Sequence, residues 1–488
     1  MTYRFGPLER RGLLGPVGAG QAVLLAVGAV LAVAALDVSP NASGAVLAAL
    51  LFAGASLGAV VPVAGRTFEQ WAPVVCAFAL RRVGGGARFR SPVPLQGSRA
   101  KVGGRLSPAA VEPVPPASLR GLRIVEAEYR DRSIGVLSEQ SGRRLTALLA
   151  CRVVAFSLLD ADAQERRLAR WGLVLSGAAG TPIRRIQWVE RTAPAQGDEL
   201  ARWLHDERDP AVPLRGTPMI ESYLELIGTT ARVTQEHEIL LAVQVDARRG
   251  RVADPPRALV EQAERVAHGL EAAEITVLGA LSATQLARVL RTAFDPFARA
   301  ELAALEAADP ERDGLAEASA WPLAAGEAWD HYRSDGAVHA TYWIGGWPRV
   351  EVSPLFMDAL LGRSSAVRAV AVTFEPIAPE RSIRETEAAI TRDRADRALR
   401  HRFGQLETAR QRQAQEATLQ REAELAAGHG EVRLSGFVTV SGRDPEDLRR
   451  ACSEVLEHAA RARLELHRMY GQQADAFTFT LPLCRGLR

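Results

Sequence analysis

The sequence predicts an α+β protein that begins with a membrane-spanning helical hairpin. Three patterns lead to this prediction. Two uncharged stretches, Gly12–Leu36 and Val38–Gly65, are separated by the single acidic residue Asp37. From Gly121 onward, short alternating segments typical of strands take turns with amphipathic helical segments. Between residues 380 and 427, a narrow apolar stripe amid dense charge has the periodicity of one long helix.

Each N-terminal stretch is long enough to cross a lipid bilayer. A helix rises about 1.5 Å per residue, so roughly 20 apolar residues span a hydrocarbon core of about 30 Å. A cleaved signal peptide is the alternative for the first stretch, but its apolar core is usually about 7–15 residues long. Leu13–Leu36 is longer and is followed at once by a second apolar run. The two stretches therefore predict a transmembrane hairpin.

Arginine placement predicts the orientation of this hairpin. Basic residues flank both of its outer ends, whereas the connecting loop Asp37–Gly44 has none. The flanking residues are Arg4, Arg10 and Arg11 before the first span, and Arg66, Arg81, Arg82, Arg88 and Arg90 after the second. Because positively charged flanks stay in the cytoplasm, we expect a two-pass protein of the plasma (inner) membrane with both termini cytoplasmic.

Small residues in the second span predict helix packing. Gly54 and Gly58 are four residues apart, a spacing that lets membrane helices approach closely. The segment Gly54-Ala55-Ser56-Leu57-Gly58 also matches the nucleophile elbow of hydrolases, but that motif requires a strand-to-helix turn. Because the segment lies within an apolar span, we interpret Gly54 and Gly58 as positions of membrane-helix packing.

Composition excludes several classes of function. A net charge of +3 creates no strong field for nucleic acid, so we expect no direct nucleic-acid binding. The cysteines are far apart and the histidines are scattered, so their spacing indicates no metal site, and we expect no cofactor. Lys101 is the only lysine and does not follow a glycine, which excludes a Walker-type phosphate-binding loop. If the protein works beside such a nucleotide-hydrolysing motor, the motor is another chain.

The segment after the hairpin predicts a helix and then a linker. Over Arg66–Val83, apolar residues recur at helical spacing, and Trp71 with the paired Arg81 and Arg82 suits the boundary of lipid headgroups. Residues 84–120 are rich in glycine and proline, which predicts a linker over the membrane surface. The hairpin and this juxtamembrane helix together form the first predicted region, residues 1–83.

Two α+β domains are predicted after the linker, over residues 121–320 and 321–488. Their alternating strands and helices are typical of split βαβ or ferredoxin-like folds. In the first domain we predict strands at 122–129, 133–138, 145–154, 183–190, 236–246 and 275–278, and helices at 161–175, 197–205, 219–229, 255–271 and 283–293. In the second we predict strands at 338–344, 366–375, 433–440 and 463–467, and helices at 353–361, at 380–427 and after Asp444. Gly404 could divide the long helix 380–427 into a hairpin.

Several short strings resemble a family of actinobacterial integral membrane proteins. The strings are Gly65–Val74, Ala79–Arg82, Gln187–Thr192, Trp329–Arg333, and the ending Tyr470–Gln473 with Leu481–Leu483. The ending is also similar to the N-terminal, non-motor domain of conjugation ATPases. The likeness extends over nearly the whole chain.

The resemblance implies a fused scaffold, because members of that family occur beside type IV secretion-like ATPases and coupling proteins. The hairpin would replace a small two-span inner-membrane subunit, and the soluble part would replace the docking domain normally joined to the ATPase. The resemblance implies no catalytic residue. The candidate interface or structural positions are Trp71, Arg81, Arg82, Trp188, Glu190, Arg191, Trp329, His331 and Tyr470. A role in core packing or in a turn is the alternative for each of them.

The first functional hypothesis is a membrane-anchored structural subunit of a type IV-like, conjugation-related secretion complex. We expect it to sit in the lipid bilayer, to form a homo-oligomer, and to dock a separate motor ATPase and other secretion subunits. The alternative is a scaffold of a type VII-like secretion core, which can share the same layout. A membrane-tethered enzyme is the third hypothesis. Glu236, His237 and Glu238 are titratable, but on a strand His237 points away from the two glutamates, so we expect no enzymatic activity.

Overall fold

The computed structural model describes residues 19–61, 65–91, 101–102, 105–106, 114–129, 132–153, 156–194, 218–219, 221–222, 235–248, 252–299, 302, 320–348, 350–362, 364–402 and 409–487. These residues confirm the predicted α+β class, because two apolar N-terminal helices precede a large antiparallel sheet. The predicted helix 197–205 and most of the predicted helix 219–229 lie outside the described residues, as do Arg4, Arg10 and Arg11.

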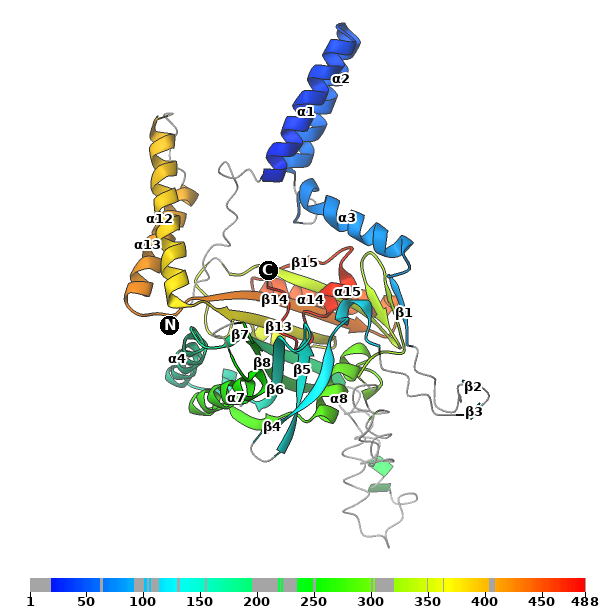
Figure 1. Ribbon diagram of the computed structural model, residues 1–488, viewed down its shortest axis with the longest axis vertical. Helices are drawn as coiled ribbons and strands as arrows, with labels where there is room; N and C mark the ends of the chain where they lie inside the picture. Colours follow the sequence, from blue (N-terminus) through cyan, green and yellow to red (C-terminus); the bar gives the residue numbers. More distant parts are fainter. Residues whose placement is uncertain are drawn as a thin grey trace.

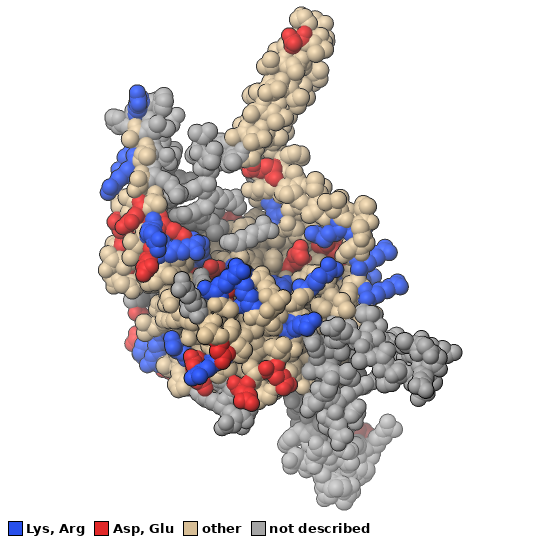
Figure 2. Space-filling model, in the orientation of Figure 1, with Lys and Arg blue, Asp and Glu red and all other residues tan. Residues whose placement is uncertain are grey.

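Helices α1 (Ala19–Val38) and α2 (Ala42–Val60) form a hairpin that stands away from the sheet (Figure 1). Both are long and apolar enough to cross a membrane. Along the visible face of this hairpin, Figure 2 shows charged side chains only near the tip and at the base. The Asn41 side chain starts α2 by accepting the N–H of Gly44 at 3.0 Å. The two predicted spans are therefore present as helices.

Gly28 rather than Gly54 lies at a close contact between α1 and α2. A Cβ built on Gly28 would overlap the Cβ of Ala55, whereas no described atom lies within 4 Å of a Cβ built on Gly54. A Cβ on Gly58 would lie 3.7 Å from both Leu24 and Phe68. Gly54 therefore faces away from α1, and its role in membrane-helix packing stays a prediction.

The first unit of the sheet has a ferredoxin-like strand order. Its elements are β6 (Arg144–Arg152), α4 (Ala161–Gly177), β7 (Ile183–Pro194), β8 (Gln235–Asp246), α7 (Pro255–Ala272) and β9 (Thr276–Ala280). The strands lie in the order β9-β6-β8-β7, each antiparallel to its neighbours. Strands β8 and β9 therefore flank β6 and are joined by α7 as a split βαβ motif. A hairpin of β4 (Arg123–Tyr129) and β5 (Arg132–Glu139) precedes this unit, and α8 (Ala283–Phe294) follows it.

The second unit repeats this arrangement. Its elements are β12 (Ala337–Gly346), α11 (Asp358–Leu361), β13 (Val367–Pro376), β14 (Val432–Gly442), α14 (Pro445–Arg461) and β15 (Glu465–Arg468). The strand order is β15-β12-β14-β13, again antiparallel throughout. The short strands β10 (Ala324–Glu327) and β11 (Tyr332–Ser334) precede β12, and α15 (Gln473–Phe477) follows β15. The chain thus contains a structural repeat, and both halves confirm the predicted split βαβ pattern.

The two units share one 13-stranded sheet through an antiparallel pairing of β7 with β13. We call this pairing the β7–β13 seam; Val189 lies opposite Ala371 within it. Each of these strands is the edge of its own unit, so the seam satisfies backbone groups that would otherwise remain open at an edge. The seam therefore makes the predicted domains at 121–320 and 321–488 parts of a continuous sheet.

Helices cover both faces of this sheet. On one face α4 and α7 pack over the first unit, around Ile186 and Val243, and α14 packs over the second, around Val438. On the other face, α8 and the chain after β15 share a core with both units. This core includes Leu148 of the first unit and Ala371 of the second. This shared core ties the units together on the face that α4, α7 and α14 leave uncovered.

The predicted long helix 380–427 is divided into α12 (Pro379–Arg402) and α13 (Ala409–Ala426), which lie side by side (Figure 1). Thr418 donates to Asp393 at 3.3 Å, and Arg397 donates to Gln415, so the two helices run in opposite directions. Gly404, the predicted point of division, lies outside the described residues. The α12–α13 hairpin is inserted between β13 and β14 and projects from the sheet.

Helix α3 (Phe68–Val83) connects the membrane hairpin to the sheet; it starts near the base of the hairpin and extends sideways from it (Figure 1). Strand β1 (Arg88–Arg90) follows and pairs with β10 at one edge of the sheet. Part of the predicted linker 84–120 therefore belongs to the folded body. Within the same region, β2 (Lys101–Val102) and β3 (Arg105–Leu106) pair only with each other among the described residues, and the turn Ala117–Leu119 leads into β4.

Candidate functional site

Most of the candidate residues near the membrane meet where α3 contacts the sheet domain. We call this contact the α3 anchor. The membrane side contributes Arg66, Trp71, Phe78 and Arg81. The sheet domain contributes Glu327, Trp329, Tyr470 and Gly471. Three predicted motifs that are distant in sequence are therefore adjacent in space.

Aromatic rings form the centre of the α3 anchor. Trp71 stacks on Trp329 with ring centroids 5.8 Å apart, and Trp329 stacks on Tyr470 at 6.5 Å. Phe78, two turns further along α3, meets Trp329 edge-on at 5.1 Å. Such pairs contribute about 0.5–1.5 kcal/mol each beyond the burial of their area. The Trp71 ring, predicted to suit the lipid headgroups, thus packs against protein.

Arg81 binds the second half of α3 to a buried carboxylate through an ion pair. Its Nε and Nη2 donate to the two oxygens of Glu327 at 3.1 and 3.4 Å, and Nη2 also donates to the Gly471 carbonyl at 2.7 Å. The Glu327 side chain is only 2% exposed and accepts the N–H of Ala474 at 3.1 Å. Burial raises the pKa of Glu327, although Ala474 and Arg81 act in the opposite direction. The neighbouring Arg82 is exposed, so the predicted arginine pair divides between two environments.

Arg66, predicted as a charge flanking the membrane, also contributes to the anchor. Its guanidinium lies over the Trp71 ring at 5.4 Å from the centroid. Its Nη2 also donates to Gln472 at 3.4 Å, in the segment after β15. Arg66 therefore joins the start of α3 to the same segment that Arg81 holds at the other end of the helix.

His331 belongs to the turn that presents Trp329. The N–H of Ala328 donates to the His331 carbonyl at 2.9 Å and closes this turn. The Nδ1 of His331 lies 2.8 Å from Asp330 Oδ1, and Arg468 donates to the Asp330 carbonyl at 2.8 Å. The turn is thus held on β15, directly beside Tyr470.

Trp188, Glu190 and Arg191 lie apart from the α3 anchor, on β7 at the seam. Trp188 is opposite Val372 and packs against the cores of both units. Glu190 is buried on the same face of the sheet, with Oε1 3.0 Å from His237 Nδ1. These two candidates therefore contribute to the junction between the units.

Arg191 points to the opposite face and holds α8. It donates to the Val289 carbonyl at 2.9 Å and to Thr292 Oγ1 at 2.8 Å, and it pairs with Glu238 at 3.2 Å. Burial lowers the pKa of Arg191, and Glu238 opposes this effect. His237 and Glu238 thus have different partners on different faces of β8, as strand alternation predicts. The side chain of Glu236 lies outside the described residues.

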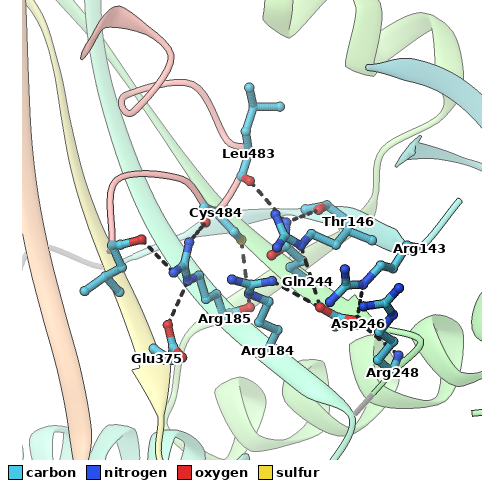
Figure 3. Close-up of polar contacts among 12 residues, drawn as sticks. Arg143, Thr146, Arg184, Arg185, Gln244, Asp246, Arg248, Glu375, Leu483 and Cys484 are labelled. Atoms are coloured by element: carbon cyan, nitrogen blue, oxygen red, sulfur yellow. Dashed lines mark hydrogen bonds and ion pairs between the residues drawn. The ribbon is translucent and has the colours of Figure 1, made fainter. Parts of the chain in front are cut away.

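A polar network under the C-terminal segment was not found by sequence reasoning. Arg185 of β7 donates to the carbonyls of Cys484 and Leu487 at 3.1 and 2.7 Å and pairs with Glu375 of β13 at 3.0 Å (Figure 3). Gln187 donates to the Phe479 carbonyl at 2.8 Å and accepts the N–H of Cys484 at 2.7 Å. The predicted motif Leu481–Leu483 therefore lies across the seam. Arg185 and Gln187, two polar residues two positions apart in β7, are the sequence signal for this network.

Asp246, at the end of β8, forms ion pairs with arginines beside this network (Figure 3). Arg143 approaches one carboxylate oxygen at 3.3 Å and Arg184 the other at 3.1 Å. Burial by itself would raise the pKa of Asp246, but the N–H of Arg248 and the two guanidinium groups lower it below its ordinary value. The carboxylate thus joins β8 to the β5–β6 turn and to β7.

Within the described ranges, no group of three or more His, Cys, Asp or Glu side chains could hold a metal ion. A hollow of about 30 Å³ is lined by Arg191, Thr292 and Thr439, among other residues. A single water molecule needs about 10–15 Å³ of such space, so the hollow has room for water.

Part of the chain is similar to a family of secretion proteins. Residues 237–344 match the model of a family described as "putative type VII ESX secretion system translocon, EccE". The match extends from β8 to β12 and so includes Glu327, Trp329 and His331. No match was found among the curated proteins. The family match and the two candidate membrane helices support a membrane-located, secretion-associated protein, and they favour the type VII alternative over the type IV hypothesis.

Proposed function

We propose that this protein is a membrane-anchored scaffold of a type VII-like secretion translocon. One observation carries the proposal. The segment that matches the translocon family, residues 237–344, contains the carboxylate and the indole that receive α3, Glu327 and Trp329. The region similar to the family is therefore also the region fastened to the membrane hairpin, as a scaffold requires.

The continuity of the folded body supports this role. Helix α3 is held at both ends by Arg66 and Arg81, and the sheet continues through the β7–β13 seam without a linker. The C-terminal segment crosses the seam and bonds to both units. Such a body keeps each of its surfaces at a set position relative to the bilayer, which lets it hold other subunits in place.

The α12–α13 hairpin is the proposed contact for such partners. It projects from the sheet (Figure 1) and carries exposed charges of both signs, including Arg384, Glu387 and Arg394. Ile390 of the predicted apolar stripe is buried, whereas Ile383 (46% exposed) and Leu419 (54% exposed) leave apolar surface beside these charges for pairing with another helix. We propose that its partners are other translocon subunits and a separate cytoplasmic ATPase, that the protein is a non-enzymatic homo-oligomer, and that both of its termini are cytoplasmic.

Purification of the full chain from membranes of its native host, in mild detergent, tests the proposal. We expect mass spectrometry to identify membrane subunits and the ATPase of a type VII system. The control bait is an unrelated two-span membrane protein at equal abundance. Recovery of a conjugation-type ATPase would instead support the type IV hypothesis, and recovery of no secretion subunit would contradict both.

A further inference from the structure

Helix α3 has an exposed apolar face opposite its anchored face. The anchored face carries Trp71, Phe78 and Arg81, as described above. On the other face, the largest exposed side chains are Phe68 (58%), Val75 (46%), Leu80 (73%) and Val83 (89%), and Ala72, Cys76 and Ala79 are exposed among them. These positions recur every three or four residues and so form one stripe, which we call the α3 stripe. A continuous apolar surface of this kind marks a contact with a partner or a membrane.

The position of α3 identifies the partner as the bilayer. Phe68 lies against α2, since a Cβ built on Gly58 would be 3.7 Å from the Phe68 Cβ. Glu69 lies against Gly20, at the start of α1. Both contacts are at the base of the hairpin, and Figure 1 shows α3 starting there and extending sideways from the hairpin. Because the hairpin spans about the thickness of a hydrocarbon core, its base is at the level of the membrane surface.

The orientation of α3 agrees with this position. The helix lies between the hairpin and the sheet domain (Figure 1), and its anchored face contacts the sheet domain. The α3 stripe therefore faces the side on which the hairpin stands. Exposed arginines lie at the far end of the helix and just beyond it, at Arg82, Arg88 and Arg90, where Figure 2 also shows basic side chains. Basic residues at this depth are attracted to anionic lipid headgroups.

We propose that α3 lies in the surface of the bilayer, with the α3 stripe against the acyl chains and the opposite face bound to the sheet domain. The helix would then be an interfacial amphipathic helix between a membrane anchor and a folded body. This inference rests on insertion of the hairpin and is independent of the class of secretion system. It assigns lipid, rather than a second copy of the chain, to the α3 stripe.

The native cysteines provide a probe for this contact. Cys76 is exposed on the α3 stripe, whereas Cys151, Cys452 and Cys484 are buried. A nitroxide reagent should therefore label Cys76 in the purified full chain. After reconstitution into nanodiscs of phosphatidylcholine and phosphatidylglycerol, electron paramagnetic resonance measures collisions of the label with oxygen, which enters lipid, and with a nickel chelate, which stays in water. We expect frequent collisions with oxygen and few with the chelate.

Two matched labels complete the experiment, both in a Cys76→Ser background. Gln70→Cys is exposed on α3 outside the stripe and should give the opposite result, with frequent chelate collisions. Val46→Cys, on α2, should show the oxygen preference of the bilayer interior and so establishes that the hairpin is inserted. With the hairpin inserted, equal chelate access at Cys76 and Gln70 would overturn the proposal. Shielding of Cys76 from both reagents would also overturn it, since the stripe would then be covered by protein.

Discussion

Gly471 lies directly against Trp329 at the centre of the α3 anchor. Its N–H donates to the Trp329 carbonyl at 2.6 Å, and its own carbonyl accepts Arg81 at 2.7 Å. Its φ is +67°, and a Cβ built on it would lie 2.6 Å from the Trp329 ring. Glycine is thus the residue that lets the aromatic and charged parts of the anchor meet.

Gly471→Ala should loosen the α3 anchor. The new methyl group would displace the Trp329 ring, and the left-handed backbone would be strained, at a combined cost of about 2–3 kcal/mol. We expect a lower midpoint of thermal unfolding in detergent and faster proteolysis at α3. Gly85→Ala is the control, because its φ is +71° but nothing lies within 4 Å of a built Cβ. Equal losses in both variants would attribute the effect to backbone strain alone.

Arg81→Ala should destabilise the protein far more than Arg82→Ala. The first variant leaves the buried Glu327 carboxylate and the Gly471 carbonyl without their donor, at a cost of about 1–3 kcal/mol. The second removes an exposed guanidinium, with an expected change within about 0.5 kcal/mol. Thermal unfolding of both variants in the same detergent checks the difference. Similar midpoints for the two variants would contradict the anchor.

Glu327→Gln should rescue part of the damage in Arg81→Ala. A neutral amide has no charge to bury, so the double variant avoids the unpaired carboxylate. A double-mutant cycle on the unfolding midpoints measures this coupling. Strictly additive losses would indicate that Arg81 and Glu327 do not interact.

His339 should make the stability depend on pH below neutrality. It is buried between Ser334 and Ser441, at 2.8 Å from each hydroxyl, and burial lowers its pKa to about 4. The unfolded chain takes up a proton near pH 6.5, so it binds more protons than the folded chain between about pH 6.5 and about pH 4. Stability should therefore fall as the pH is lowered through this range, by up to about 3 kcal/mol, and be unaffected by this group above neutrality.

A variant isolates the effect of His339. His339→Gln should flatten the pH dependence of the unfolding midpoint in this range, at some cost in stability at neutral pH. His268→Gln, at an exposed position of α7, is the control and should keep the slope of the parent protein. An unchanged slope in His339→Gln would show that other groups cause the pH dependence.

Gln187→Met should release the C-terminal segment from the seam. The side chain is fully buried and serves both the Phe479 carbonyl and the Cys484 N–H. Loss of both hydrogen bonds leaves two buried backbone groups unsatisfied, at about 1–3 kcal/mol for each. Gln420→Met, at an exposed position of α13, should cost only a few tenths of a kcal/mol. Unfolding midpoints and carboxypeptidase digestion check the pair, and resistance of Gln187→Met to digestion would contradict the role.

The pattern of strands and helices could be predicted because it depends on local periodicity. The stripe in α7 results from burial of one face, which the sequence records directly. Strand β6 is a short, mostly apolar run because both of its faces are buried. The start of α14 could also be predicted from nearby residues, because Asp444 caps the helix by accepting the N–H groups of Glu446 and Asp447. The division of the helix 380–427 was harder to predict, because charged helical residues suit one long helix as well as two shorter ones.

The candidate site could be predicted only residue by residue. Separate motifs contain the aromatic residues Trp71, Trp329 and Tyr470. Their contact could not be predicted, because no periodicity relates positions so distant in the chain. Glu327 and Gly471 had no predicted role, because their importance comes from what they contact. Trp188 and Glu190 were grouped with the same candidates, and the structure assigns them to the seam instead.

The sequence by itself determined the apolar hairpin and the split βαβ pattern of each unit. The hairpin follows from two helices that are apolar on all sides, and the split βαβ pattern follows from the local periodicity of strands and helices. Only the tertiary structure decided that β7 pairs with β13, that the C-terminal segment crosses this seam, and that α3 binds beside β15. The physical reason is that edge strands pair through backbone groups that every residue has. Contacts between segments hundreds of residues apart likewise depend on shape that forms only after the local elements have folded.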